Sequence, residues 1–477
     1  MILYNRLKGN FPDFMEGGIL MEEKDFEKKS KKIIWIVVVV AILLIVALIA
    51  GILYFNSKIK GDDTFKTSVK DVFKMIENSQ EELAKAPQKG KIEVEVTAEL
   101  DTNNAELKTL NPIIKAIKLN TVAEVDRDKK VLNQNITATY DGEQVISLDA
   151  LLQDEGIYVY LNDIFDKYID LTSALTETLS EETGLSALDF NTIFAKNDNV
   201  FNKNLLKDIE NIVLDTIEKK EIKSEKTELN GEKVKKSICT LTAQETVTLV
   251  RDIMAKIAEY EQIEEFNDVV DELNYLLEEG DFSQDNYIEF SLYTKGMKNE
   301  FEKLTAKVYQ EKSAILTIDV IKEENKTTIT LKAGGALLAI VAEKEKDTTT
   351  VKFLVNLYEA KVSTATELAK IVVNKENDNA YSIQLIVHVG EIMAIADTDY
   401  QDTKLDVILN IKYKENYDVD VEKRDVSNSV AIEDLTEEEL QTILNNIQKN
   451  EILKALIDQM GLIETEQEIV ESLEEAV

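Results

Sequence analysis

The chain has 477 residues, 44% of them apolar, which is too apolar for a disordered protein and enough for two or three hydrophobic cores. Its 55 basic and 91 acidic residues give a net charge of −36, which argues against nucleic acid as a partner. The single Cys239 and single His388 exclude an internal disulfide and a zinc site built from four Cys or His ligands. The sequence contains no catalytic motif, and we expect no cofactor.

Residues 33–55 form an uncharged apolar stretch of 23 residues, long enough as a helix to cross a bilayer core of about 30 Å. Trp35 lies at one end and Tyr54 and Phe55 at the other, where aromatic rings favour the lipid headgroups. Lys31 and Lys32 complete a Lys-rich segment before this stretch, so the positive-inside rule places the N-terminus in the cytoplasm. A cleaved signal peptide is the alternative, but its apolar region is usually shorter.

The residues before the apolar stretch, 1–32, are expected to form a short cytoplasmic tail. Glu16-Gly17-Gly18 can be encoded by a bacterial ribosome-binding sequence, at a workable distance from the codon for Met21. We therefore hypothesise that Met21 is the initiator and that residues 1–20 are not translated. The bulk of the chain is expected outside the cell membrane, to which it is attached by a single span.

Residues 62–220 are expected to form a first lobe. A helical pattern over residues 63–86 is followed by strict alternation from Lys91 to Leu100, which marks a strand with one apolar and one polar face. Strands are expected at 119–126, 131–140, 144–152 and 157–161, and the short turns between them imply antiparallel neighbours. Asn111-Pro112 suggests a short helix over the sheet, and helical patterns occupy residues 171–219.

Residues 221–432 are expected to form a second lobe with a similar order of elements. A strand-like segment at 223–242 leads into helices over 244–279, and a long series of strands follows, including 381–389, 392–398 and 405–413. Residues 433–477 are expected to form C-terminal helices and an acidic tail. Thr436 and Glu439 have the spacing of a capping box that starts the first of these helices.

The alternation in residues 381–389 places His388 on the polar face of its strand. An ordinary solvated histidine is the simpler interpretation, and a ligand or catalytic role is the alternative. On the same polar face Leu354, Ile386 and Ile408 each lie between two polar residues of their strands. If the strands are in register, these three residues form an apolar stripe, either covered by a C-terminal helix or open as a groove for a lipid or peptide.

Asp397, Asp399 and Asp402 cluster within an expected hairpin, where carboxylate oxygens at this density can bind Ca²⁺. The loop lacks the glycine and the terminal glutamate of an EF-hand. Asp is also an ordinary turn residue, so a simple hairpin turn is the alternative interpretation.

These elements predict an α+β protein, with one N-terminal transmembrane helix and then long antiparallel curved sheets packed with helices in two lobes. The Lys-rich tail, single apolar stretch and long acidic remainder resemble uncharacterised membrane-anchored proteins of AT-rich Gram-positive bacteria. A helix followed by long antiparallel strands also resembles the curved half-barrel of LolA and LppX lipoprotein carriers.

The function that we expect is non-enzymatic binding or scaffolding in the cell envelope. The bilayer is the expected partner of residues 33–55, and an envelope protein or an apolar ligand is the expected partner of the remainder. The alternative is a carrier or sensor of a lipid or other apolar ligand in a half-barrel groove, and a hydrolase that uses two carboxylates is the third hypothesis.

Overall fold

The structure is a computed structural model of the whole chain. It describes residues 89–103, 105–175, 203–261, 264–280, 282–296, 300–377, 379–396, 402–415 and 420–452, together with residues 70, 73, 194 and 400. The chain divides into two compact units. Unit 1 consists of residues 1–85, 197–345 and 351–367, and unit 2 of residues 86–196, 346–350 and 368–477.

Unit 1 contains a sheet of antiparallel strands that pair in chain order. These are β7 (Lys223–Leu229), β8 (Glu232–Thr242), β9 (Tyr287–Lys295), β10 (Glu300–Gln310), β11 (Ser313–Lys322), β12 (Lys326–Ala333) and β13 (Ala336–Glu345). Most of β14 (Thr348–Asn356) and the short helix η1 (Val362–Thr364) also belong to this unit. Short turns join these strands, as at Gly334-Gly335, where both glycines have positive φ as a tight hairpin requires.

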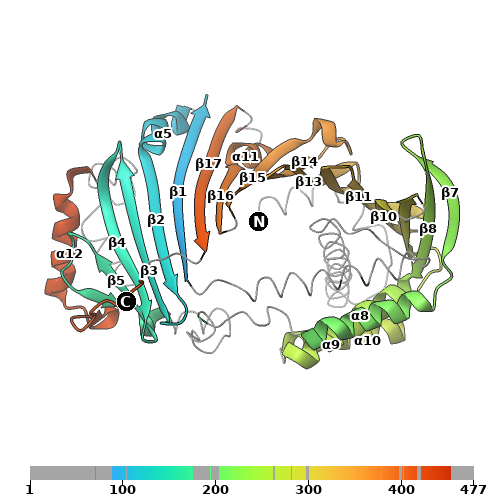
Figure 1. The fold of residues 1–477 in the computed structure, drawn as a ribbon, viewed down its shortest axis with the longest axis horizontal. Coiled ribbons are helices and arrows are strands. Elements are labelled where there is room, and N and C mark those ends of the chain that lie inside the picture. The colour runs from blue at the N-terminus through green and yellow to red at the C-terminus, as the bar shows by residue number, and fades with distance from the viewer. Residues whose placement is uncertain are drawn as a thin grey trace, which may run out of the picture. The chain divides into compact units, whose positions relative to one another are not determined.

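Three helices of unit 1 lie side by side in Figure 1: α8 (Lys203–Glu218), α9 (Ala243–Glu261) and α10 (Glu264–Glu279). Ile253 of α9 packs against Leu205 and Ile209 of α8, and Leu273 of α10 packs against Val250 of α9. The helices predicted over residues 244–279 are therefore present.

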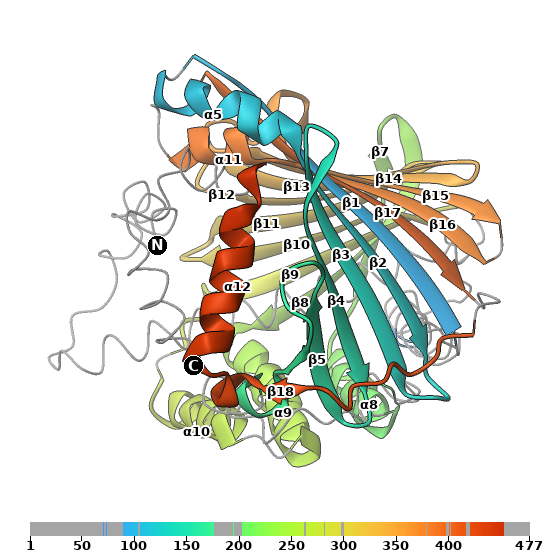
Figure 2. The same ribbon diagram turned by 90° about the vertical axis from the view of Figure 1, so that its left-hand side faces the viewer.

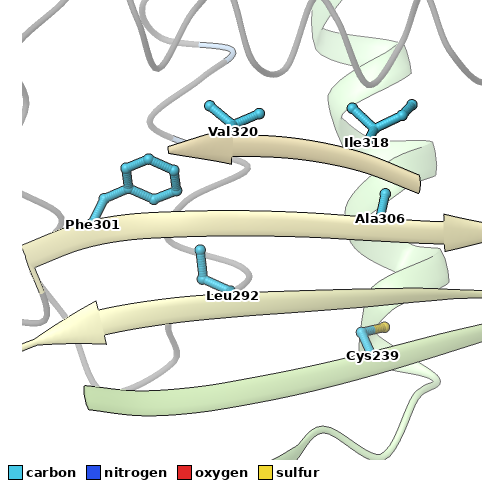
Figure 3. Close-up of a cluster of buried hydrophobic side chains, with 6 residues drawn as sticks. All are labelled: Cys239, Leu292, Phe301, Ala306, Ile318 and Val320. Carbon is cyan, nitrogen blue, oxygen red and sulfur yellow. The ribbon is translucent and has the colours of Figure 1, made fainter. Parts of the chain in front are cut away.

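The core of the unit 1 sheet is drawn in Figure 3. It contains Cys239 of β8, Leu292 of β9, Phe301 and Ala306 of β10, and Ile318 and Val320 of β11, all less than 9% exposed. Ile217 of α8 packs against this cluster. Burial keeps the Cys239 thiol away from water and raises its pKa, so this cysteine is a core residue.

Unit 2 contains the second set of strands. In spatial order they are β15 (Thr366–Asn377, of which the first two residues belong to unit 1), β16 (Ala380–His388), β17 (Thr403–Glu415), β1 (Lys89–Thr102), β2 (Ile117–Asp126), β3 (Val131–Tyr140), β4 (Glu143–Gln153), β5 (Gly156–Leu161), β6 (Tyr168–Asp170) and β18 (Val430–Ala431). The first strand of the unit therefore pairs with one of the last. This non-local pairing joins the N-terminal and C-terminal segments of unit 2 in one sheet.

Helices cover parts of the unit 2 sheet: α5 (Ala105–Ala116), α11 (Val389–Ala396) and α12 (Glu437–Lys449), which follows the short helix η3 (Ile432–Asp434). Ile113 of α5 packs against Ile117 and Tyr140, while Ile443 of α12 packs against Ile146 and Leu161. The short helix predicted around Pro112 and the capping box of Thr436 are both present.

The expected fold class is wrong in two respects. Strand residues outnumber helical residues in the described chain, so the fold is dominated by sheet and the α+β class is wrong. The pairing is mixed, because β18 returns to lie parallel to β6. None of the helices in the described residues is long and apolar enough to cross a membrane, and the predicted span at 33–55 lies outside the described residues.

The segment predicted as a strand at 392–398 contains helix α11 instead. Val389, Ile392, Met393 and Ala396 have helical spacing, which competes with the alternation of Ile392, Ala394 and Ala396. Gly390 allows this helix to lie directly on the start of β17, since a Cβ atom there would come within 2.2 Å of the Thr403 carbonyl oxygen. Tertiary packing therefore decides an ambiguous local pattern.

Residues 420–428 form an extended segment, which we call the strap. Figure 2 shows it crossing the ends of β2, β3 and β4 in the reddish colour of the C-terminal region. The side chain of Gln153, only 1% exposed, donates to the carbonyl of Arg424 at 2.7 Å and accepts from the N–H of Arg424 at 2.9 Å. Asn133 Nδ2 donates to the carbonyl of Glu422 at 3.2 Å. Side chains thus take the place of a strand partner for the strap.

We predict that Gln153→Ala destabilises the protein by about 2–4 kcal/mol, because it leaves two backbone groups of the strap without partners and opens a cavity. Urea unfolding followed by circular dichroism measures this change. Gln144→Ala, at an exposed position of the same strand, is the matched control and should change stability by less than about 0.5 kcal/mol. Equal effects of the two substitutions would show that the strap does not depend on Gln153.

A second prediction concerns Glu439, which closes the capping box of α12. The hydrogen bond from Lys167 and those from the Thr436 N–H and hydroxyl lower the pKa of Glu439 to about 2. The carboxyl group of a glutamate in an unfolded chain has a pKa of about 4.3. The contribution of Glu439 to folding stability is therefore complete above that pH and is lost as the pH falls toward 2.

The stability difference between the wild type and Glu439→Gln should therefore be largest at neutral pH and should shrink as the pH falls through this window. Thermal unfolding at a series of pH values measures it. Glu437→Gln, in the same helical turn, controls for the general effect of removing one negative charge. A difference that stays constant across the window would contradict the assignment.

Candidate functional site

The polar face of the unit 2 sheet contains the residues that the sequence singled out. β16 and β17 pair so that Gln384 faces Asn410, Ile386 faces Ile408, and His388 faces Asp406. Gln384 Nε2 donates to Asn410 Oδ1 at 3.0 Å, and Asn410 Nδ2 donates to Glu95 Oε1 of β1 at 3.4 Å. The two isoleucines therefore lie between two polar rows.

His388 is held on this face by its neighbour. Its Nδ1 lies 2.7 Å from Asp406 Oδ1, and the two side chains are 23% and 32% exposed. A carboxylate at Nδ1 fixes the orientation of the ring and favours one tautomer. The arrangement is that of a partly solvated strand histidine paired across the sheet.

The apolar stripe is only partly assembled within one unit. Ile386 and Ile408 are direct cross-strand neighbours and both are half-buried. Leu354 lies on β14 in unit 1. Unit 2 by itself thus provides a pair of apolar side chains, with Thr97 of β1 as the next residue in the row.

Only one of the three predicted metal ligands lies in the described chain. Asp402 is an exposed turn residue before β17, while Asp397 and Asp399 lie outside the described residues. No group of three His, Cys, Asp or Glu side chains suited to a metal ion occurs in the described part of the chain. The membrane-interface residues Lys31, Lys32, Trp35, Tyr54 and Phe55 also lie outside it.

The opposite face of the same sheet carries a larger apolar surface. In the register of β1, Val94 faces Ile411 and Val96 faces both Leu409 of β17 and Leu119 of β2. We call this surface the apolar patch and define it as Ile92, Val94, Val96, Leu119, Leu409 and Ile411.

The apolar patch is accessible to solvent. Ile92 is 39% exposed and Leu119 is 38% exposed, and the other four members are half-buried. The clusters formed by α5 and α12 contain none of these six residues. Adjacent exposed apolar side chains in the middle of a sheet are characteristic of an interaction surface.

Sequence reasoning placed the candidate groove on the polar face and missed this patch as a site. The alternation of Lys91 to Leu100 was a sufficient signal for an apolar face. Whether another element covers that face depends on contacts between residues distant in the chain, which local patterns do not contain.

Comparisons with known proteins identify no family for this chain. No family and no curated protein matches the sequence. Among solved structures, a mutant porin from Rh. blastica is 8% identical, covers 68% of this chain and 98% of its own, and has a TM-score of 0.18. A mutant transferrin binding protein B from Haemophilus parasuis is 7% identical, covers 70% and 79%, and has a TM-score of 0.11. Similarities this low do not support any conclusion about fold or function.

Proposed function

We propose that this protein is a non-enzymatic binding or scaffolding protein of the cell envelope, which contacts its partner through the apolar patch of unit 2. The observation that supports the proposal is the adjacency of the six patch residues, two of them more than a third exposed. Exposed apolar surface of this kind is costly in water, so a partner that covers it gains free energy.

The hydrophobic contribution to such binding can be estimated from the apolar area that the partner covers. Covering about 400 Å² of apolar surface is favourable by about 10 kcal/mol, before the entropy of association and the ordering of side chains are subtracted. The aliphatic character of the patch suits an apolar surface segment of another envelope protein. Attachment to the bilayer through the apolar residues 33–55, with the bulk of the chain outside the cell, is part of this proposal and rests on the sequence alone.

A second candidate is a carrier or sensor of a lipid or other apolar ligand. It is favoured by the chemistry of the central patch, where Val94, Val96, Leu409 and Ile411 present only aliphatic groups. An acyl chain needs no hydrogen-bonding partner, whereas a protein partner usually adds polar contacts around an apolar centre.

The proposal predicts that Leu119→Lys abolishes complex formation, because a charge within the patch must be desolvated when the partner binds. Cross-linking of the full chain in cells, followed by gel electrophoresis, measures the complex. Leu338→Lys is the matched control, since Leu338 is an exposed leucine of the unit 1 sheet, 52% exposed, and its substitution should leave the complex intact. Loss of the complex with both variants, or with neither, would contradict the proposal.

The carrier candidate makes a separate prediction. A fluorophore attached at Leu119→Cys should shift its emission to shorter wavelength when oleate is added to the full chain in phosphatidylcholine vesicles. The same label at Lys118→Cys, the adjacent exposed position on the opposite face, should not respond. Cys239 is only 2% exposed and should not compete for the label. Equal responses at the two positions would rule out a lipid-binding face.

A further inference from the structure

The polar face of the unit 1 sheet contains a buried row of small polar side chains. Ser291 of β9 faces Thr305 of β10, Thr305 faces Asp319 of β11, and Asp319 faces Thr330 of β12. All four are at most 5% exposed, although they lie on the face opposite the Cys239 core. Buried polar groups normally find hydrogen-bonding partners, so each member of the row can be checked.

The carboxylate of Asp319 has three hydrogen-bonding or ionic partners. Its Oδ1 accepts from Thr305 Oγ1 at 2.8 Å and lies 2.9 Å from Lys303 Nζ, while its Oδ2 lies 3.2 Å from Lys332 Nζ. Burial would raise the pKa of Asp319, but the bonds from Lys303 and Thr305 outweigh it and hold the pKa below its usual value. The carboxylate therefore gathers two ammonium groups around itself.

Thr330 is the exception in the row. It is 3% exposed, and its hydroxyl has no hydrogen-bonding partner in the described part of the chain. It lies directly opposite Asp319 and two residues before Lys332 on the same face of β12. A buried hydroxyl without a hydrogen-bonding partner costs free energy. A group that binds a ligand is expected to lack such a partner when no ligand is bound.

The charges around Thr330 favour an anion. Lys307 of β10 lies on the same face, between Glu289 and Thr317 in register, and makes no ion pair with any described residue. Among Lys303, Lys307, Lys332, Asp319 and Glu289 of this face, the lysines outnumber the carboxylates by one, in a chain whose net charge is −36. The side chains of Lys303 and Lys332 are 21% and 35% exposed, so solvent reaches them.

We propose that this face of unit 1 binds a phosphate group, held by the ammonium groups of Lys332 and Lys307 and by the hydroxyl of Thr330. Phosphate oxygens accept several hydrogen bonds at once, and lysine is a common point-charge ligand for them. Asp319 is a positioning residue in this site, because it orients Lys303 and Lys332 without touching the ligand. The proposal is independent of the apolar patch, which belongs to unit 2.

The test is isothermal titration of the full chain with inorganic phosphate. The wild type should bind with a dissociation constant of about 1 mM or below. Thr330→Val removes the hydroxyl at constant shape and should weaken binding about tenfold, as should Lys332→Met. Thr294→Val is the matched control: Thr294 is 2% exposed, also has a hydroxyl without a partner among the described residues, and lies on the opposite face of the same sheet.

Thr330→Val and Thr294→Val should both be at least as stable as the wild type in phosphate-free buffer, because each removes a buried hydroxyl that has no partner in the described chain. Lost binding then reports the site and not the fold. Tighter binding of polyphosphate than of phosphate would assign the site to a phosphate-bearing polymer, and equal affinities would assign it to the free ion; both support the proposal. No binding by the wild type, or unchanged binding by Thr330→Val, would overturn it.

Discussion

The pairing of β1 with β17 on one side and β2 on the other is the constraint on which both faces of unit 2 depend. Side chains alternate along a strand, so a shift of one residue would exchange the apolar and polar faces. The buried hydrogen bond between the Thr102 and Thr403 hydroxyls, at 2.8 Å, helps to hold the register of β1 with β17. The apolar patch follows from this register, and the His388–Asp406 pair follows from the pairing of β16 with β17.

The later part of the chain covers specific edges of the unit 2 sheet. The strap binds the ends of β3 and β4 through Asn133 and Gln153, and α12 packs on the apolar face at β4 and β5. The hydrogen bonds of the strap join residues that are 271 and 289 positions apart in the chain. Ordering such long loops costs entropy, which buried hydrogen bonds and apolar contacts must offset. Their positions leave the centre of the apolar face accessible.

Much of the fold could be predicted where the pattern is local. Alternation identified β1, and the spacing of Thr436 and Glu439 identified the start of α12. The polar residues on either side of Ile386 and Ile408 predicted that these two isoleucines face each other, as they do in the observed register. The sequence-based predictions failed where distant contacts decide, as in α11 and in the parallel pairing of β18 with β6. The two candidate sites were missed for the same reason. Asp319 and Thr330 become neighbours only through strand pairing, and the exposure of Leu119 depends on what the rest of the chain leaves uncovered.

The central claim is that the accessible apolar face of unit 2 is the binding surface. The most direct test places a photoreactive amino acid, p-benzoylphenylalanine, at residue 119 of the full chain in living cells and, in a parallel experiment, at residue 118. These neighbours point to opposite faces of β2, and both are exposed. The account predicts an adduct with a protein or lipid from position 119 and none from position 118. Equal adducts from both positions, or an adduct from position 118 alone, would contradict it.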